Sequence, residues 1–178
     1  MITIDKEFTF EETYPLSNLG KREELLFFDI ETTGFSGDYN QVYLIGCVYF
    51  SEASAHFIQW FADSKSAETE VIDSFFNFAK DYRTLVHFNG DTFDIPFIEK
   101  RCHALKLPYT FDHLESIDIY KRITPYKKHL RLENLKQKSI EVFLGIDRDD
   151  KYTGGQLIEV YAEYLQTKDP SLLKLLLL

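Results

Sequence analysis

Two acidic residues stand at the end of an apolar run near the start of the chain. The run 25–31 reads LLFFDIE and is followed by TTG. In a strand, residues two apart project from the same face, about 6.5–7 Å from each other, so Asp29 and Glu31 share a face. Burying unpaired charges is costly, and carboxylate oxygens suit Mg²⁺ or Mn²⁺. The pair therefore predicts a divalent-cation site, unless both acids simply end the strand in solvent or pair with a basic neighbour.

A second acidic group follows a later strand. The sequence NGDTFD, residues 89–94, comes after a short apolar stretch and opens a predicted helix. Ligands of open α/β sheets collect beside the carboxyl ends of strands, and this turn is expected there. The helix dipole would favour Asp94 in the first turn even without a ligand, and Asp91 fits a helix N-cap. Asn89 and Gly90 suit a plain turn equally well.

The elements that must position these groups follow from hydrophobic periodicity and turn residues. The predicted strands are 25–31, 41–50, 55–61, 84–88 and 110–119. The predicted helices are 66–82, 92–105, 132–143 and 155–166, with a Leu-rich tail at 171–178. Hairpin strands followed by strand–helix–strand crossovers describe an α/β fold with a mixed sheet. Residues 1–24 are mostly polar and are expected to form an N-terminal leader packed on the core.

Three segments together resemble the DEDD 3′→5′ exonucleases of the ribonuclease H-like superfamily. They are FDIETTG at 28–34, HFNGDTFD at 87–94 and HLRLENL at 129–135. The overall pattern is most similar to the stand-alone bacterial branch of predicted ribonuclease H-like exonucleases, and the second segment looks like family-B DNA polymerase proofreading domains. The resemblance implies a five-stranded mixed sheet of order 3-2-1-4-5, with strand 2 antiparallel and helices on both faces.

The resemblance also implies which residues act. Asp29, Glu31 and Asp94 would be catalytic ligands of two Mg²⁺ or Mn²⁺ ions, which two-metal hydrolysis holds about 3.5–4 Å apart. The substrate would be single-stranded DNA or RNA, hydrolysed from its 3′ end. Thr32, Thr33 and Gly34 are expected to contact its terminal nucleotide, and Asn89 is expected to be a further substrate-binding residue.

The sequence departs from the family in its last motif. The family requires a fourth Asp on a late helix, four or five residues after a Tyr or His. The one formal match, His113 with Asp118, comes only 24 residues after Asp94 and falls in a predicted strand. Asp118 as a helix N-cap or as a partner of a ligand is the alternative.

Residues 25–178 are therefore expected to be an exonuclease domain that stops before its last catalytic helix, or else a degenerate enzyme. A catalytically silent nucleic-acid-binding or scaffold module is one rival function. A structure-selective endonuclease on the same sheet is another.

Charge is unevenly distributed along the chain. The formal net charge is −9, yet residues 119–138 carry +6. Tyr120 and Tyr126 lie among the basic residues, a combination that can bind phosphates while a ring stacks on a base. The expected phosphate contacts are Lys127, Lys128 and Arg131. The alternative is an ordinary solvated helix face.

Other features exclude whole classes of function. Cys47 and Cys102 are 55 positions apart and the five His residues are scattered, which predicts neither a disulfide framework nor a zinc site. No P-loop, dinucleotide or serine-hydrolase motif occurs. No targeting or membrane-spanning segment is recognised, so a cytoplasmic protein without a membrane partner is expected.

Overall fold

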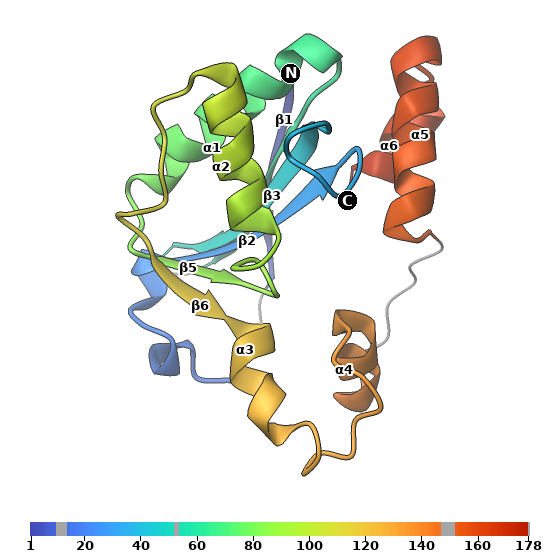
Figure 1. Cartoon of the computed structure of the whole chain (residues 1–178). Coiled ribbons are helices and arrows are strands. Elements are labelled where there is room, and N and C mark those ends of the chain that lie inside the picture. The colour runs from blue at the N-terminus through green and yellow to red at the C-terminus, as the bar shows by residue number, and fades with distance from the viewer. Residues whose placement is uncertain (10–13, 52–53, 147–151, 178) are drawn as a thin grey trace.

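The computed structural model describes residues 1–9, 14–51, 54–146 and 152–177. These residues form one mixed sheet with helices around it (Figure 1). The strands are β1 (Ile2–Phe8), β2 (Leu25–Thr32), β3 (Val42–Phe50), β4 (Ala55–Phe61), β5 (Thr84–His87) and β6 (Glu115–Asp118). Their order across the sheet is β1-β4-β3-β2-β5-β6. β2 is central, antiparallel to β3 and parallel to β5.

The sheet has six strands rather than the expected five, while the five predicted strands keep their predicted order as β4-β3-β2-β5-β6. The additional strand β1 lies within the segment expected to be a leader, and it pairs antiparallel with β4 from Ile2–Phe61 to Phe8–Ala55. Most of its side chains are exposed, as befits a strand at the edge of a sheet. The antiparallel pairing of the strand that follows β2 is confirmed.

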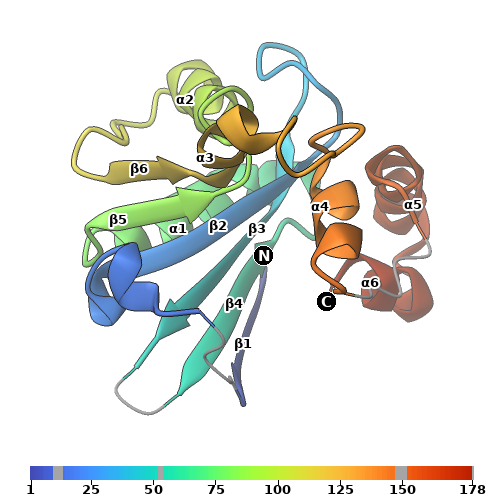
Figure 2. The same cartoon turned by 90° about the horizontal axis from the view of Figure 1, so that it is seen from below.

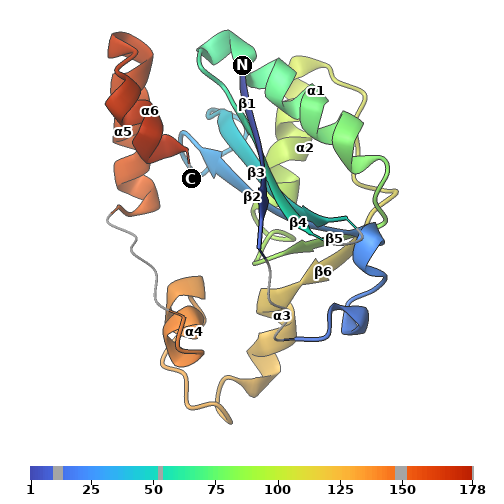
Figure 3. The same cartoon turned by 180° about the vertical axis from the view of Figure 1, so that it is seen from behind.

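The helices are arranged on both sides of the sheet (Figures 1 and 3). They are α1 (Glu68–Ala79), α2 (Asp94–Leu105), α3 (Ile119–Ile123), α4 (Gln137–Phe143), α5 (Gly154–Thr167) and α6 (Pro170–Leu176). α1 and α2 cover one face, while α4, α5 and α6 lie on the other side of β2. None of the helices in the described ranges combines the length and apolar character that a bilayer crossing needs.

Two predicted elements are shorter than expected. β6 has four residues because it pairs along β5, which itself runs only from Thr84 to His87. The helix predicted from residue 132 begins at Gln137 instead. Before it, Arg131 adopts a φ of +54°, and the Asn134 side chain accepts a hydrogen bond from the Lys136 N–H at 2.9 Å. Both features favour a turn over a helix.

The core divides between the two faces of β2. Leu26, Phe28 and Ile30 face the helical layer, where the rings of Phe28 and Phe75 of α1 are 5.0 Å apart. On the opposite face, Leu25 packs in a second cluster with Leu16 of a short 3₁₀ helix, Leu16–Asn18. Figure 2 shows the sheet and the surrounding helices from below. The same face carries Asp29 and Glu31 further along β2, where the strand leaves the second cluster.

Candidate functional site

Asp29 and Glu31 project into a cavity on this face of the sheet. The cavity, called here the sheet-face cavity, has a volume of about 500 Å³, and α4, α5 and α6 contribute to its walls. Asp29 pairs with Gly46 of β3, and Gly46 pairs with Gln59 of β4. Gly46 and Gln59 both line the cavity, and a Cβ at Gly46 would make an ordinary contact with Gln59 Cγ at 3.8 Å. Asp29 is exposed and Glu31 is half-buried, so both carboxylates are accessible from the cavity.

Asp94 approaches the same end of β2 from the start of α2. The parallel pairing of β2 with β5 ends at Phe27 and Val86, so the last residues of β2 extend past β5. In this overhang the backbone N–H of Ile30 donates a hydrogen bond to Asp94 Oδ1 at 3.3 Å. Asp94 is only 4% exposed. A backbone contact therefore fixes a buried carboxylate beside the strand that carries Asp29 and Glu31.

The three carboxylates affect one another electrostatically. Burial raises the pKa of Asp94 to about 7, and the negative charge of Asp29, followed more weakly by that of Glu31, adds to this effect. Backbone hydrogen bonds from Ile30 and Asp94 itself act in the opposite direction. A negative charge on Asp94 is therefore disfavoured mainly by its removal from water, and the neighbouring carboxylates add to this.

Such a group of oxygen donors fits a hard divalent cation. A bound cation would compensate the charge that raises the Asp94 pKa. In the described part of the chain, however, Asp29, Glu31 and Asp94 do not form a group whose oxygens all lie within 4.8 Å of one another. The three carboxylates are therefore less closely gathered than the ligand atoms of the group formed by His87, Asp91 and Asp118.

A tighter cluster occurs nearby at the ends of β5 and β6. Potential ligand atoms of His87, Asp91 and Asp118 all lie within 4.8 Å of one another. Lys121 Nζ already contacts Asp91 Oδ2 at 2.5 Å, and Ser116 Oγ donates to Asp91 Oδ1 at 2.5 Å. Burial alone would raise the pKa of Asp91, but these two hydrogen bonds hold it below its usual value. Lys121 and Ser116 therefore already stabilise the negative charge of Asp91.

The sequence did not reveal this cluster, because only the pairing of β5 with β6 brings its members together. His87 pairs directly with Asp118, and His87 Nε2 lies 2.8 Å from Ser116 Oγ. The Gly90 N–H donates to His87 Nδ1 at 3.0 Å. With both ring nitrogens engaged, His87 serves to hold the turn that leads to Asp94. A His two residues before Asn89 was the sequence signal for this role.

Asp118 also supports the turn. Its Oδ1 accepts hydrogen bonds from the Asn89 N–H at 2.9 Å and from the Lys121 N–H at 3.3 Å, the second as the N-cap of α3. Asn89 has a φ of +63°, which asparagine tolerates better than most residues. The alternative role of Asp118 as an N-cap is therefore confirmed. His113 is exposed and precedes β6.

The loop after β2 places the remaining residues expected to contact substrate. Thr32 is buried, and its Oγ1 donates to the Gly34 carbonyl at 2.7 Å. Thr33 Oγ1 accepts from the Gln41 N–H at 2.9 Å, which closes the base of the loop. A Cβ on Gly34 would lie 2.6 Å from Asn40 Oδ1, so a glycine is required for the turn itself. Thr33 and Gly34 remain partly exposed.

A buried ion pair anchors this loop to the helices. Arg101 of α2 donates from Nε and Nη2 to the two oxygens of Glu68 at 2.8 Å each, and from Nη1 to the Gly37 carbonyl at 3.0 Å. Glu68 Oε1 also accepts from the Val42 N–H at 2.9 Å. Such a bidentate, fully hydrogen-bonded pair is geometrically specific. It was not predicted because its partners are 33 residues apart.

The basic residues occupy different environments. Lys127 is half-buried and lines a second cavity with Phe88, Asn89 and Tyr120. Lys128 and Arg131 are exposed on the segment between α3 and α4. The structure therefore places Lys127 beside the turn that leads to Asp94, whereas the other two predicted phosphate contacts lie on the outer surface.

Comparison with known proteins identifies the family. The family model RNase_H_2 of the RNase_H superfamily matches residues 26–178. The chain belongs to the RNase H superfamily. The resemblance inferred from the sequence is thus confirmed, and so is the ribonuclease H-like α/β fold.

Relatives and solved structures extend this result. The uncharacterized protein YprB of Bacillus subtilis (strain 168) is 29% identical over 161 residues, which cover 86% of this chain and 37% of YprB. A DNA polymerase of Thermococcus aggregans is 35% identical over 91 residues, 46% of this chain and 5% of the polymerase.

The family B DNA polymerase from Pyrobaculum calidifontis has the same fold in part of its structure. Its TM-score with this chain is 0.66 at 18% identity, and the match covers 85% of this chain and 22% of the polymerase. The chain therefore spans little more than a third of YprB and a smaller share of the polymerases.

Proposed function

We propose that this chain is a divalent-metal-dependent nuclease that removes nucleotides from the 3′ end of single-stranded DNA or RNA. The observation that carries the proposal is the convergence of Asp29, Glu31 and Asp94 at one end of β2, with the buried Asp94 at a pKa of about 7. The superfamily membership and the similarity to DNA polymerases support it. In this proposal residues 25–178 form the exonuclease domain, and β1 extends its sheet.

Each residue has a distinct part. Asp29, Glu31 and Asp94 would hold the Mg²⁺ or Mn²⁺ ions. When bound, such ions stabilise the charge on the attacking and leaving oxygens of a phosphodiester and favour deprotonation of water. The Ile30 N–H fixes Asp94 against β2, so the carboxylate is positioned before substrate arrives. The exposed surfaces of Thr33 and Gly34, together with Asn89, lie where the terminal nucleotide would be bound.

A catalytically silent nucleic-acid-binding module is the second candidate. It is favoured by one observation in the described residues, namely that the oxygens of the three carboxylates are not gathered within 4.8 Å of one another. An enzyme and a silent module both bind nucleic acid, but only the enzyme releases nucleotides. An endonuclease would release internal fragments instead.

The test is hydrolysis of 5′-labelled single-stranded DNA and RNA with Mn²⁺, with Mg²⁺ and with EDTA. The proposal predicts stepwise shortening from the 3′ end that EDTA stops. Asp29→Asn and Asp94→Asn should each abolish it. Asp81→Asn is the matched control, because Asp81 is exposed and precedes the amino end of β5, opposite the site. Equal hydrolysis by Asp94→Asn and the wild type would overturn the site, and metal-independent binding without hydrolysis would identify the silent module.

A further inference from the structure

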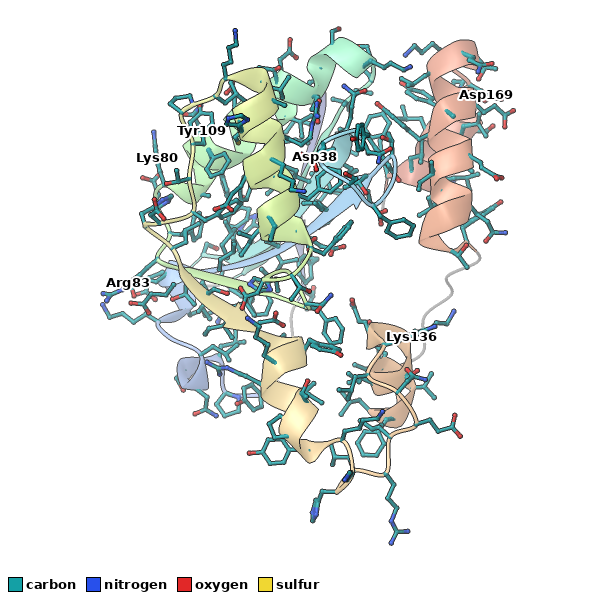
Figure 4. All side chains as sticks on the ribbon, viewed as in Figure 1. Asp38, Lys80, Arg83, Tyr109, Lys136 and Asp169 are labelled. Carbon is teal, nitrogen blue, oxygen red and sulfur yellow. The ribbon has the colours of Figure 1, made fainter. Side chains whose placement is uncertain are left out.

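A second cavity lies beside the sheet-face cavity, between the end of β5, α3 and the start of α4. It has a volume of about 590 Å³ and is called here the Tyr120 cavity. Its lining residues are Phe88, Asn89, Tyr120, Lys127, Asn134, Leu135, Lys136 and Gln137. Figure 4 shows Lys136 on the segment that enters α4, across from α3. A volume of this size accommodates a small ligand.

The chemistry of the lining is unusual for this chain. Two aromatic rings, three side-chain amides and two lysines surround the space, and none of the described residues that line it carries a carboxylate, although the net charge of the protein is −9. Aromatic rings stack on nucleobases, amides hydrogen-bond to base edges, and lysines bind phosphate. The lining therefore offers partners for the face of a base, for its hydrogen-bonding edge and for a phosphate.

We propose that the Tyr120 cavity binds one nucleotide of a single-stranded nucleic acid, with its base against Phe88 and Tyr120 and its phosphate at Lys127 and Lys136. The two rings meet edge to face, with centroids 5.8 Å apart and planes at 82°. An edge-to-face pair leaves ring faces that are not stacked on each other. A planar base can therefore stack on one of them.

The charges in this region favour a phosphate. Lys121, the basic residue nearest to Tyr120 in sequence, is already paired with Asp91. Neither Lys127 nor Lys136 forms an ion pair within the part of the chain that the structure describes. Lys127 is half-buried, and an ammonium group that is partly removed from water gains from an anionic partner.

The Tyr120 cavity adjoins the sheet-face cavity. Phe88 and Gln137 line both this cavity and the sheet-face cavity that contains Asp29 and Glu31. Asn89 lines the Tyr120 cavity and begins the turn that ends at Asp94. This inference rests on the proposed function, and it places the bound nucleotide beside the carboxylate site.

The experiment measures binding of fluorescent single-stranded oligonucleotides by anisotropy in EDTA, so that hydrolysis does not contribute. Tyr120→Ala should weaken binding by about 5- to 150-fold, the range expected for loss of one stacked base, and Tyr120→Phe should restore it. Lys127→Ala and Lys136→Ala should each reduce the salt slope by about 0.7. Tyr126→Ala and Lys138→Ala are matched controls from the same segment, because both residues are exposed and lie outside the cavity lining.

The outcomes separate this inference from the proposed function. Equal losses in the cavity variants and their controls would show diffuse attraction to the basic segment and would overturn the cavity assignment. Unchanged binding by Tyr120→Ala, with circular dichroism matching the wild type, would also overturn it. If the cavity variants weaken binding but the wild type releases no nucleotides with Mn²⁺, the subsite is supported and the nuclease function is rejected. DNA and RNA probes of one sequence establish which sugar the cavity accepts.

Discussion

Replacing Asp94 with asparagine should stabilise the protein at neutral and alkaline pH. Asparagine keeps an oxygen for the hydrogen bond from the Ile30 N–H and removes the charge. The pKa of Asp94 is about 7 in the folded protein against an ordinary value of 3.8. Each unit of difference corresponds to about 1.4 kcal/mol, so the charged carboxylate lowers the free energy of unfolding by at most about 4 kcal/mol.

The sign of the pH dependence follows from the direction of the shift. The folded protein binds a proton at Asp94 more tightly than the unfolded chain does, so this residue makes stability fall as pH rises from about 4 to about 7. Below this range both states are protonated and the residue has no effect. Above this range, the ionised Asp94 carboxylate lowers the free energy of unfolding by its full amount. Asp94→Asn should remove this part of the pH dependence.

The assay is urea unfolding in EDTA between about pH 4 and pH 8, followed by the fluorescence of Trp60, the single tryptophan, which is buried. Asp81→Asn serves as the matched control, since Asp81 is exposed. The free-energy curves of Asp94→Asn and the wild type should converge at acid pH and separate as pH rises. Parallel curves, or a variant that is less stable at pH 8, would refute the electrostatic description of the site.

Two further predictions concern the residues that support the site. Arg101→Ala should lower the free energy of unfolding by about 3–5 kcal/mol, because it leaves the buried Glu68 carboxylate unpaired, and Glu68→Met with Arg101→Met should recover much of this loss. In urea unfolding, a loss no greater than that of Lys100→Ala, which removes an exposed ion pair, would contradict this. Asp118→Ala should cost about 1–2 kcal/mol by the same assay, because α3 loses its N-cap. It should also weaken oligonucleotide binding, and a variant with unchanged affinity would show that the turn at Asn89 needs no support from Asp118.

Much of the sheet could be predicted because β2, β3, β4 and β5 are apolar runs bounded by turn residues. β1 could not, because most of its side chains face solvent and only backbone pairing with β4 defines it. The short β6 and the late start of α4 depend on the length of β5 and on the turn at Arg131 and Asn134. These are tertiary and local backbone effects that cannot be inferred from the hydrophobic periodicity of the sequence.

The site was partly predictable for a similar reason. Asp29 and Glu31 could be placed on one face from the alternation of β2 alone, and Asp94 from its position after β5. That Asp94 reaches the Ile30 N–H depends on β2 extending past β5, which no local pattern shows. The contacts of Asp118 with Asn89 and of Arg101 with Glu68 join residues 29 and 33 positions apart. Their roles became evident only from the folded chain.

Binding of Mn²⁺, followed by electron paramagnetic resonance at pH 8, tests the central claim most directly. The wild type and Asp91→Asn should bind Mn²⁺ with similar affinity, because Asp91 is already compensated by Lys121. Asp94→Asn should lose this binding. Loss of Mn²⁺ binding in Asp91→Asn with full retention in Asp94→Asn would contradict the account and place the metal at His87, Asp91 and Asp118 instead.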